Sequence, residues 1–271
     1  MTKLYQVSTW QEFLALVESE ELRGWAFRGQ RDAEWSLESS LTRRLKQFVP
    51  QSKWHERESR AIRVFKRKAH YFLNDTSALK DDFRCLALMQ HHGAPTRLLD
   101  FTKSPYVASY FALQSCTTHA AVYAVNTPAL WHKATPPGLP ELTRDAIDPR
   151  TTDSLGKYYL SNNYPIVWPG EPWSMDRRIV AQAGTFMLPG RIDVSVEELL
   201  NNYEYDQPLL AKIVLSPEIR KEAMEALYRM NISSATLFPD LDGLARSISY
   251  ELEVSWVGTP DPKNDQLMQD K

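Results

Sequence analysis

The sequence predicts a single large α+β domain built on a mixed sheet, with covering helices and a proline-rich insert. The chain of 271 residues is long enough for one large domain, and hydrophobic residues make up 43% of it, which suffices for a core. Apolar segments of strand length alternate with amphipathic segments of helical length. Eight of the 17 prolines fall within residues 126–176, where periodicity is lost. That stretch is expected to form a long irregular insert packed over the core.

The first elements alternate between helix and strand. A short amphipathic helix over 10–19 should lead into a strand around 25–29, and a long helix should cover 52–73. The long helix carries an apolar stripe, with basic side chains on the opposite face. The stripe consists of Ile62, Phe65, Ala69 and Phe72, and the basic face of Arg60, Arg63, Arg67 and His70.

Glu58 falls on the apolar stripe of this long helix, an unusual position for a carboxylate. An unpaired carboxylate buried there would cost on the order of several kcal/mol. We therefore expect Glu58 to be buried and to pair with an arginine of the segment 27–43, Arg28 or Arg43.

Residues 90–112 combine a helix end, a strand with polar side chains and a new helix start. The preceding helix should end at Gly93, because glycine adopts the left-handed cap at low cost. Pro95 favours extended backbone, and the alternation that follows puts one set of side chains on a common face. That set is Thr96, Leu98, Asp100 and Thr102. Ser104 and Pro105 then predict an N-cap and first helical turn, and a polar strand leading into a helix N-terminus is suited to an anionic ligand.

The second half is expected to add four strands and two helices. The expected strands are 120–125, 178–188, 211–215 and 251–256. One helix should follow the cap at 216–218 and the other the turn at 239–243. The residues after 259 are polar, so we expect a domain over 1–258 and a short tail over 259–271.

The composition and motifs exclude several classes of site. Cys85 and Cys116 lie in apolar helical patterns, which excludes a disulfide framework and a cysteine-based zinc site. Walker, G-x-G-x-x-G, H-E-x-x-H and G-x-S-x-G motifs are absent. Asp240 and Asp242 fit turn and N-cap chemistry, so no metal site is assigned. Without an apolar leader or a run of about 18 apolar residues, we expect a soluble cytoplasmic protein that does not enter a membrane.

Four blocks of sequence carry a resemblance to a known family. The first, 27–43, opens with Phe27-Arg28-Gly29, and the others are 90–112, 178–186 and 237–245. In this order they resemble the bacterial FRG-domain family, named after that triplet, over roughly residues 25–250. FRG-domain proteins have been suggested to share the ADP-ribosyltransferase-like fold. The resemblance thus implies a mixed sheet core of that type, NAD as the substrate, and a role as toxin or effector in anti-phage defence.

The same resemblance implies where NAD would be held. In the ADP-ribosyltransferase-like fold a strand arginine grips the NAD phosphate, which points to Arg28. A Ser-Thr-Ser strand running into a helix corresponds to residues 100–102, and a later strand carboxylate corresponds to Gln182. Here Asp100 replaces the first Ser and Gln182 replaces the Glu. Gln hydrogen-bonds a ribose but supplies no charge, so Asp100 or a histidine would have to stabilise the oxocarbenium-like transition state.

Two sets of candidate residues follow from these considerations. The candidate catalytic residues are Arg28, His91, Asp100 and Gln182, and the candidate NAD-binding residues are Arg28, Gln30, Arg97, Thr102 and Arg178. His91 would act as a general base or stack on the nicotinamide, although a histidine at a helix C-terminus also stabilises the helix dipole. Arg97 and Arg178 would clamp phosphate. We expect Arg28, Arg97, Asp100, Thr102 and Gln182 to converge on one cleft.

The formal net charge of −2 conceals an asymmetry. Residues 43–68 contain ten Lys or Arg side chains and two Glu, a local charge of +8, so the rest of the chain carries −10. Arg60, Arg63, Arg67 and His70 recur at three- and four-residue steps, which keeps them on one helix face. This ridge is either a contact surface for a nucleic acid or an acidic protein, or an ordinary solvated face.

Three functional hypotheses remain open on the sequence. The first is an ADP-ribosyltransferase or NAD glycohydrolase. The second is a non-catalytic module that binds a nucleotide or a phage component, which the replacement of Glu by Gln182 favours. The third is an enzyme that acts on nucleic acids, supported by the basic helix alone.

Overall fold

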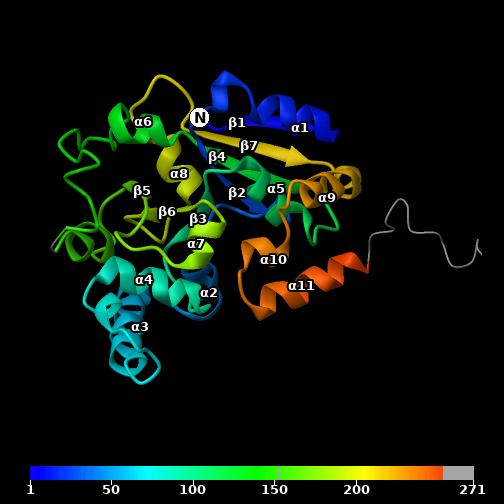
Figure 1. The fold of residues 1–271 in the computed structure, drawn as a ribbon. Helices are drawn as coiled ribbons and strands as arrows, with labels where there is room; N and C mark the ends of the chain where they lie inside the picture. Colours follow the sequence, from blue (N-terminus) through cyan, green and yellow to red (C-terminus); the bar gives the residue numbers. More distant parts are fainter. Residues whose placement is uncertain (152, 253–271) are drawn as a thin grey trace, which may run out of the picture.

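The computed structural model of the chain describes residues 1–151 and 153–252 (Figure 1). Within them one seven-stranded sheet has the strand order β1-β7-β4-β2-β3-β6-β5. Of the described strand pairs, β1 and β7 are parallel and the remaining pairs are antiparallel, so the predicted mixed sheet and α+β class are confirmed. The strands are β1 (Lys3–Val7), β2 (Ala26–Gln30), β3 (Leu99–Thr102), β4 (Ala120–Val125), β5 (Val167–Gly170), β6 (Gly184–Pro189) and β7 (Leu210–Leu215).

Helices cover both faces of the sheet (Figure 1). They are α1 (Trp10–Val17), α2 (Ser40–Phe48), α3 (Trp54–Ala69), α4 (Asp82–His91), α5 (Pro105–Leu113), α6 (Thr127–His132), α7 (Arg177–Ala181), α8 (Val196–Asn201), α9 (Arg220–Arg229), α10 (Ser234–Leu237) and α11 (Leu241–Glu251). Side chains of α1, α5, α9 and α10 share one core with β2, β4 and β7. Side chains of α6 and α8 share a second core with other residues of the same strands. A third core joins α3 and α4 to β5, β6 and the proline-rich segment.

Local signals explain the elements on either side of the site. Gly93 has φ +79° and follows α4, as expected for a left-handed cap. The Ser104 side chain accepts a hydrogen bond from the backbone N–H of Val107, and Pro105 begins α5. Both expectations for residues 90–112 are therefore confirmed, and β3 is held between two helix ends.

Gly29 is required by close packing of β2 against α5. A Cβ atom at this position would lie 2.0 Å from the backbone oxygen of Ala108 and 2.6 Å from the backbone nitrogen of Ala112. No side chain rotation relieves a clash with backbone atoms. The glycine of the Phe27-Arg28-Gly29 triplet thus serves the contact between strand and helix.

We expect Gly29→Ala to lower the free energy of unfolding by about 2–3 kcal/mol, because α5 must shift to admit the methyl group. Urea denaturation followed by circular dichroism measures the change. Gly156→Ala is the matched control, since a Cβ there meets nothing within 4 Å. Equal stability of both variants would show that α5 is not pressed against β2.

Three predictions about secondary structure were wrong. The expected strand over 178–188 is split, because Asp176 accepts hydrogen bonds from the backbone N–H groups of Arg178 and Ile179 and so starts α7. β6 begins only at Gly184. The expected strand over 251–256 is wrong at Glu251, which ends α11, and residues 253–256 lie outside the described residues. Helix α3 ends at Ala69, so Phe72 is not on its packed stripe.

The proline-rich segment is more ordered than expected. It contains α6, a π-helical turn over Leu155–Leu160, and β5. Trp168 is fully buried, as predicted, whereas Trp131 and Trp173 are exposed. An arginine stacks on each exposed ring. The Cζ atom of Arg144 lies 3.4 Å from the centre of the Trp131 ring, and that of Arg150 lies 4.1 Å from the centre of the Trp173 ring. Cation–π contacts thus replace the expected burial.

Candidate functional site

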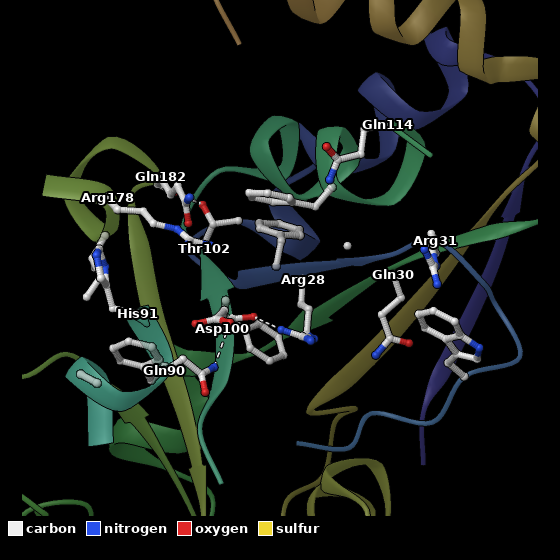
Figure 2. A pocket seen from close by; sticks show the side chains of 18 of the residues that line it. Arg28, Gln30, Arg31, Gln90, His91, Asp100, Thr102, Gln114, Arg178 and Gln182 are labelled. Atoms are coloured by element: carbon white, nitrogen blue, oxygen red, sulfur yellow. Dashed lines mark hydrogen bonds between the residues drawn. The ribbon is translucent and has the colours of Figure 1, made fainter. Parts of the chain in front are cut away.

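A cleft of about 400 Å³ opens where the sheet parts between β2 and β3 (Figure 2). These two strands pair at a single register position, Phe27 with Thr102, whereas β2 pairs with β4 over five positions. The C-terminal end of α4 and the short helix α7 close one side of the cleft. Its polar lining comprises Arg28, Gln30, Arg31, Ser36, Arg43, Gln90, His91, Asp100, Thr102, Gln114, Ser115, Asp176, Arg178 and Gln182.

Arg28 bridges the gap between the two separating strands. Its Nη1 donates a hydrogen bond to the backbone oxygen of Asp100 at 2.7 Å (Figure 2). Its Nε is buried without a hydrogen-bond partner, and among the described residues Arg28 makes no ion pair. Burial lowers the pKa of the Arg28 guanidinium; the nearby Asp100 carboxylate opposes this effect, and Arg43 adds to it. A half-buried guanidinium whose Nε donor is buried and unused is a ready site for an anion.

Gln90 fixes the carboxylate of Asp100. The Gln90 side-chain nitrogen donates to Asp100 Oδ2 at 2.9 Å and to the backbone oxygen of Leu98 at 3.2 Å. Its side-chain oxygen accepts a short hydrogen bond from the Thr96 hydroxyl. Asp100 is exposed to the cleft. Because the partner that holds its carboxylate is the neutral Gln90, the negative charge remains available to a ligand.

The opposite wall is built by α7 and the residue that follows it. Gln182 is the C-cap of this helix rather than a strand residue, which corrects the sequence expectation. Its backbone oxygen accepts from Thr102 Oγ1 at 2.7 Å, and its side-chain nitrogen donates to the backbone oxygen of Leu237 at 3.0 Å. The guanidinium of Arg178 lies over the Phe238 ring at 4.5 Å. Figure 2 shows Arg178, Gln182 and Thr102 on one side of the cleft, and Gln30 and Arg31 on the other.

His91 joins α4 to α7 at the edge of the cleft. Its Nδ1 lies 3.0 Å from Asp176 Oδ2, while Asp176 Oδ1 caps α7. Both side chains are about one-third exposed. Because Nδ1 is engaged, Nε2 is the ring nitrogen left to accept a proton.

Gln30, at the end of β2, presents a buried acceptor. Its side chain is 5% exposed, and its Oε1 has no hydrogen-bond partner within residues 1–151 and 153–252. Its side-chain nitrogen makes only a long contact of 3.4 Å to the backbone oxygen of Ser36. Beside it the guanidinium of Arg31 lies 5.0 Å from the centre of the Trp35 ring. An unpartnered buried acceptor in a cleft wall calls for a donor from a ligand.

Arg97 does not reach the cleft, and its expected role in phosphate binding is wrong on this structure. It is fully buried and pairs with Glu58 through two hydrogen bonds, one of 2.7 Å and one shorter. A further bond runs to the backbone oxygen of Pro189 at 2.9 Å. Since β3 begins only at Leu99, the alternation inferred from Thr96 onward does not set the direction of Arg97. Glu58 is buried as predicted, but its partner is Arg97 rather than Arg28 or Arg43.

Residues 23–121 match the family of the FRG domain. This stretch of the chain corresponds to an FRG domain. The matched stretch runs from just before β2 into β4 and carries Arg28, Gln90, His91, Asp100 and Thr102. No curated protein and no solved structure matches the chain.

The FRG domain supplies only part of the cleft. Asp176, Arg178 and Gln182 lie outside the matched residues but line the same cleft as side chains of the matched stretch. Sequence reasoning missed Gln90, Arg43 and Asp176 as site residues. Gln90 is the first residue of the family block 90–112, and Asp176 is a residue type that favours the N-cap of a helix. Both features could have indicated these positions from the sequence.

No helix among residues 1–151 and 153–252 has the length and apolar character needed to cross a membrane. Within the same residues no group of three or more His, Cys, Asp or Glu side chains is arranged to hold a metal ion.

Proposed function

We propose that the FRG-domain cleft binds NAD and that the chain cleaves the bond between nicotinamide and ribose, with transfer of ADP-ribose to an acceptor or to water. The observation that supports this most is the set of guanidinium groups around one cleft, namely Arg28, Arg31, Arg43 and Arg178. A diphosphate is the ligand group that matches several arginines at once. Arg28 already has a buried donor without a partner.

The neutral side chains of the cleft suit the remaining groups of a dinucleotide. Gln30 Oε1 would accept from an amide or amino group, such as the carboxamide of nicotinamide or the adenine amine. Gln182 donates through its nitrogen to Leu237, so its side-chain oxygen is left to accept from a ribose hydroxyl. The ligand would thus lie across the gap between β2 and β3.

Asp100 and His91 have positions that fit the chemical step. As the glycosidic C–N bond breaks, its electron pair leaves with the nicotinamide nitrogen, and positive charge develops on the ribose. The Asp100 carboxylate would stabilise this charge. The attacking hydroxyl, amine or water then loses a proton, for which His91 Nε2 is the candidate acceptor.

The resemblance to the FRG family suggests that this activity serves as a toxin or effector in bacterial defence against phage, within the cytoplasm. The alternative function is a non-catalytic module that binds a nucleotide or a phage component. Gln182 favours it, since an amide replaces the carboxylate expected at this position.

Incubation of the protein with NAD labelled in the nicotinamide ring, and separately in the adenine, tests the proposal. We expect nicotinamide release together with label on an acceptor or in free ADP-ribose. NAD binding without release would establish the binding module. Absence of both would overturn the NAD proposal.

Arg178→Ala should weaken NAD binding about 10- to 100-fold, because a charged hydrogen bond contributes about 1.5–3 kcal/mol. Isothermal titration calorimetry measures the Kd. The matched control is Arg177→Ala, which removes the preceding arginine of α7, an exposed residue outside the cleft lining. Equal weakening by both variants would indicate a general charge effect rather than a phosphate contact.

A further inference from the structure

The basic face of α3 is exposed and largely uncompensated. Arg60, Arg63, Arg67 and His70, here called the α3 ridge, are all exposed. Among the described residues none of the three arginines forms an ion pair, because the acidic side chains of this helix are engaged elsewhere. Glu56 pairs with Lys53, and Glu58 is buried with Arg97. The exposure expected from the sequence is confirmed, and the positive charge is not neutralised locally.

Two aromatic side chains continue the α3 ridge. Helix α3 ends at Ala69, and the next residues include Tyr71 and Phe72, which are 81% and 85% exposed. The His70 and Tyr71 rings are in contact, with centroids 4.0 Å apart. The sequence pattern places Phe72 in the core, so its exposure is a feature that the structure adds. Exposed aromatic rings that follow a row of arginines along the chain offer surfaces on which unstacked bases can stack.

We propose that the α3 ridge, with Tyr71 and Phe72, binds single-stranded nucleic acid. Arg60, Arg63 and Arg67 lie on one face and span seven residue steps, about 10 Å of helix. Three guanidinium groups on one face can each contact a phosphate of the same strand. The guanidinium groups contact the phosphates, and the bases stack on the two aromatic rings. A duplex fits less well because its bases are already stacked on one another.

Other partners account for fewer of these observations. An acidic protein would engage the arginines but gives no reason for two almost fully exposed aromatic rings. An anionic membrane would need an apolar helix face to insert. On α3 that face is packed into the core through Ile62 and Phe65. The ridge is separate from the NAD proposal, since none of its residues lines the cleft.

Fluorescence anisotropy with a labelled single-stranded 12-mer RNA, and with a duplex of the same sequence, tests this proposal. We expect tighter binding of the single strand. The logarithm of its affinity should fall with the logarithm of salt concentration with a slope of about −2, as for three phosphate contacts. Binding that does not respond to salt, or a preference for the duplex, would overturn the proposal.

Two double variants separate charge from stacking. Arg63→Glu with Arg67→Glu should abolish binding, whereas Lys133→Glu with Lys221→Glu, an equal charge change at exposed lysines elsewhere, should leave most of it. Tyr71→Ala with Phe72→Ala should weaken binding at least about 10-fold with the salt slope unchanged. Circular dichroism confirms that each variant is folded. Retained RNA binding by the arginine variant, or binding to phosphatidylserine vesicles but not to RNA, would overturn the assignment.

Discussion

Replacing Glu58 by Gln should lower the free energy of unfolding by about 3–5 kcal/mol, one of the largest effects expected of a single substitution in this chain. The Arg97 guanidinium is fully buried, and Glu58 supplies its carboxylate partner through two hydrogen bonds. A neutral amide of the same size would leave a positive charge in the interior with only carbonyl oxygens around it. Chemical denaturation of the purified variant measures the loss.

Two further variants show whether the cost comes from the lone charge. Glu58→Leu combined with Arg97→Met removes both charges and should recover a large part of the stability, because apolar side chains of similar volume replace a buried ion pair well. Glu56→Gln, on the same helix as Glu58 but in an exposed pair with Lys53, should leave stability within experimental error. A stable Glu58→Gln protein would show that Arg97 is not held by this carboxylate.

The fold class and the local boundaries near the site follow from the sequence. Gly93 and Ser104 are residues whose chemistry specifies a helix end and a helix start, so the segment between them was predicted closely. The buried strand over residues 120–125 was predicted because its apolar run is short and unbroken. Such signals are local and need no knowledge of tertiary contacts.

Arg97 and Gln182 show where sequence reasoning fails. The same polar strand context surrounds Arg28 and Arg97, yet one guanidinium enters the cleft and the other the core. That difference depends on Glu58, which lies 39 residues away from Arg97. At Gln182 the pattern of a strand was overridden by Asp176, whose side chain caps a single turn of helix. A long-range ion pair sets the direction of the Arg97 side chain, and a strong N-cap sets the conformation before Gln182. Neither can be inferred from the periodicity of the sequence.

Phe72 illustrates a third kind of failure. Its spacing continues the apolar stripe of α3, but the helix ends at Ala69 and the ring points to solvent. Periodicity indicates which face an apolar residue would take if the helix continued. It does not indicate where the helix stops, and here the difference moves an aromatic ring from the core to the surface.

On the proposed function, replacing Asp100 by Asn should slow nicotinamide release about 10²- to 10³-fold, the usual effect of removing one stabilising group from a charged transition state. Asn keeps the size of the side chain and an oxygen to accept from Gln90, so the geometry of the cleft is preserved. The Kd for NAD should stay the same or decrease, because a negative charge near the phosphates is lost. Single-turnover rates and calorimetry separate the two quantities.

The carboxylates that line the cleft differ in the partners they have. Two of them line it, and Asp176 is engaged in capping α7 and in the contact with His91. Among the described residues Asp100 makes no ion pair and its carboxylate accepts a side-chain hydrogen bond from the neutral Gln90, so its charge is available to a ribose that becomes positive. Asp145→Asn, at a carboxylate that is 93% exposed and outside the cleft, is the control for the loss of one negative charge. If Asp100→Asn releases nicotinamide as fast as the wild type, Asp100 does not supply the negative charge that is missing at Gln182. If the wild type is also slow, that result favours the non-catalytic module.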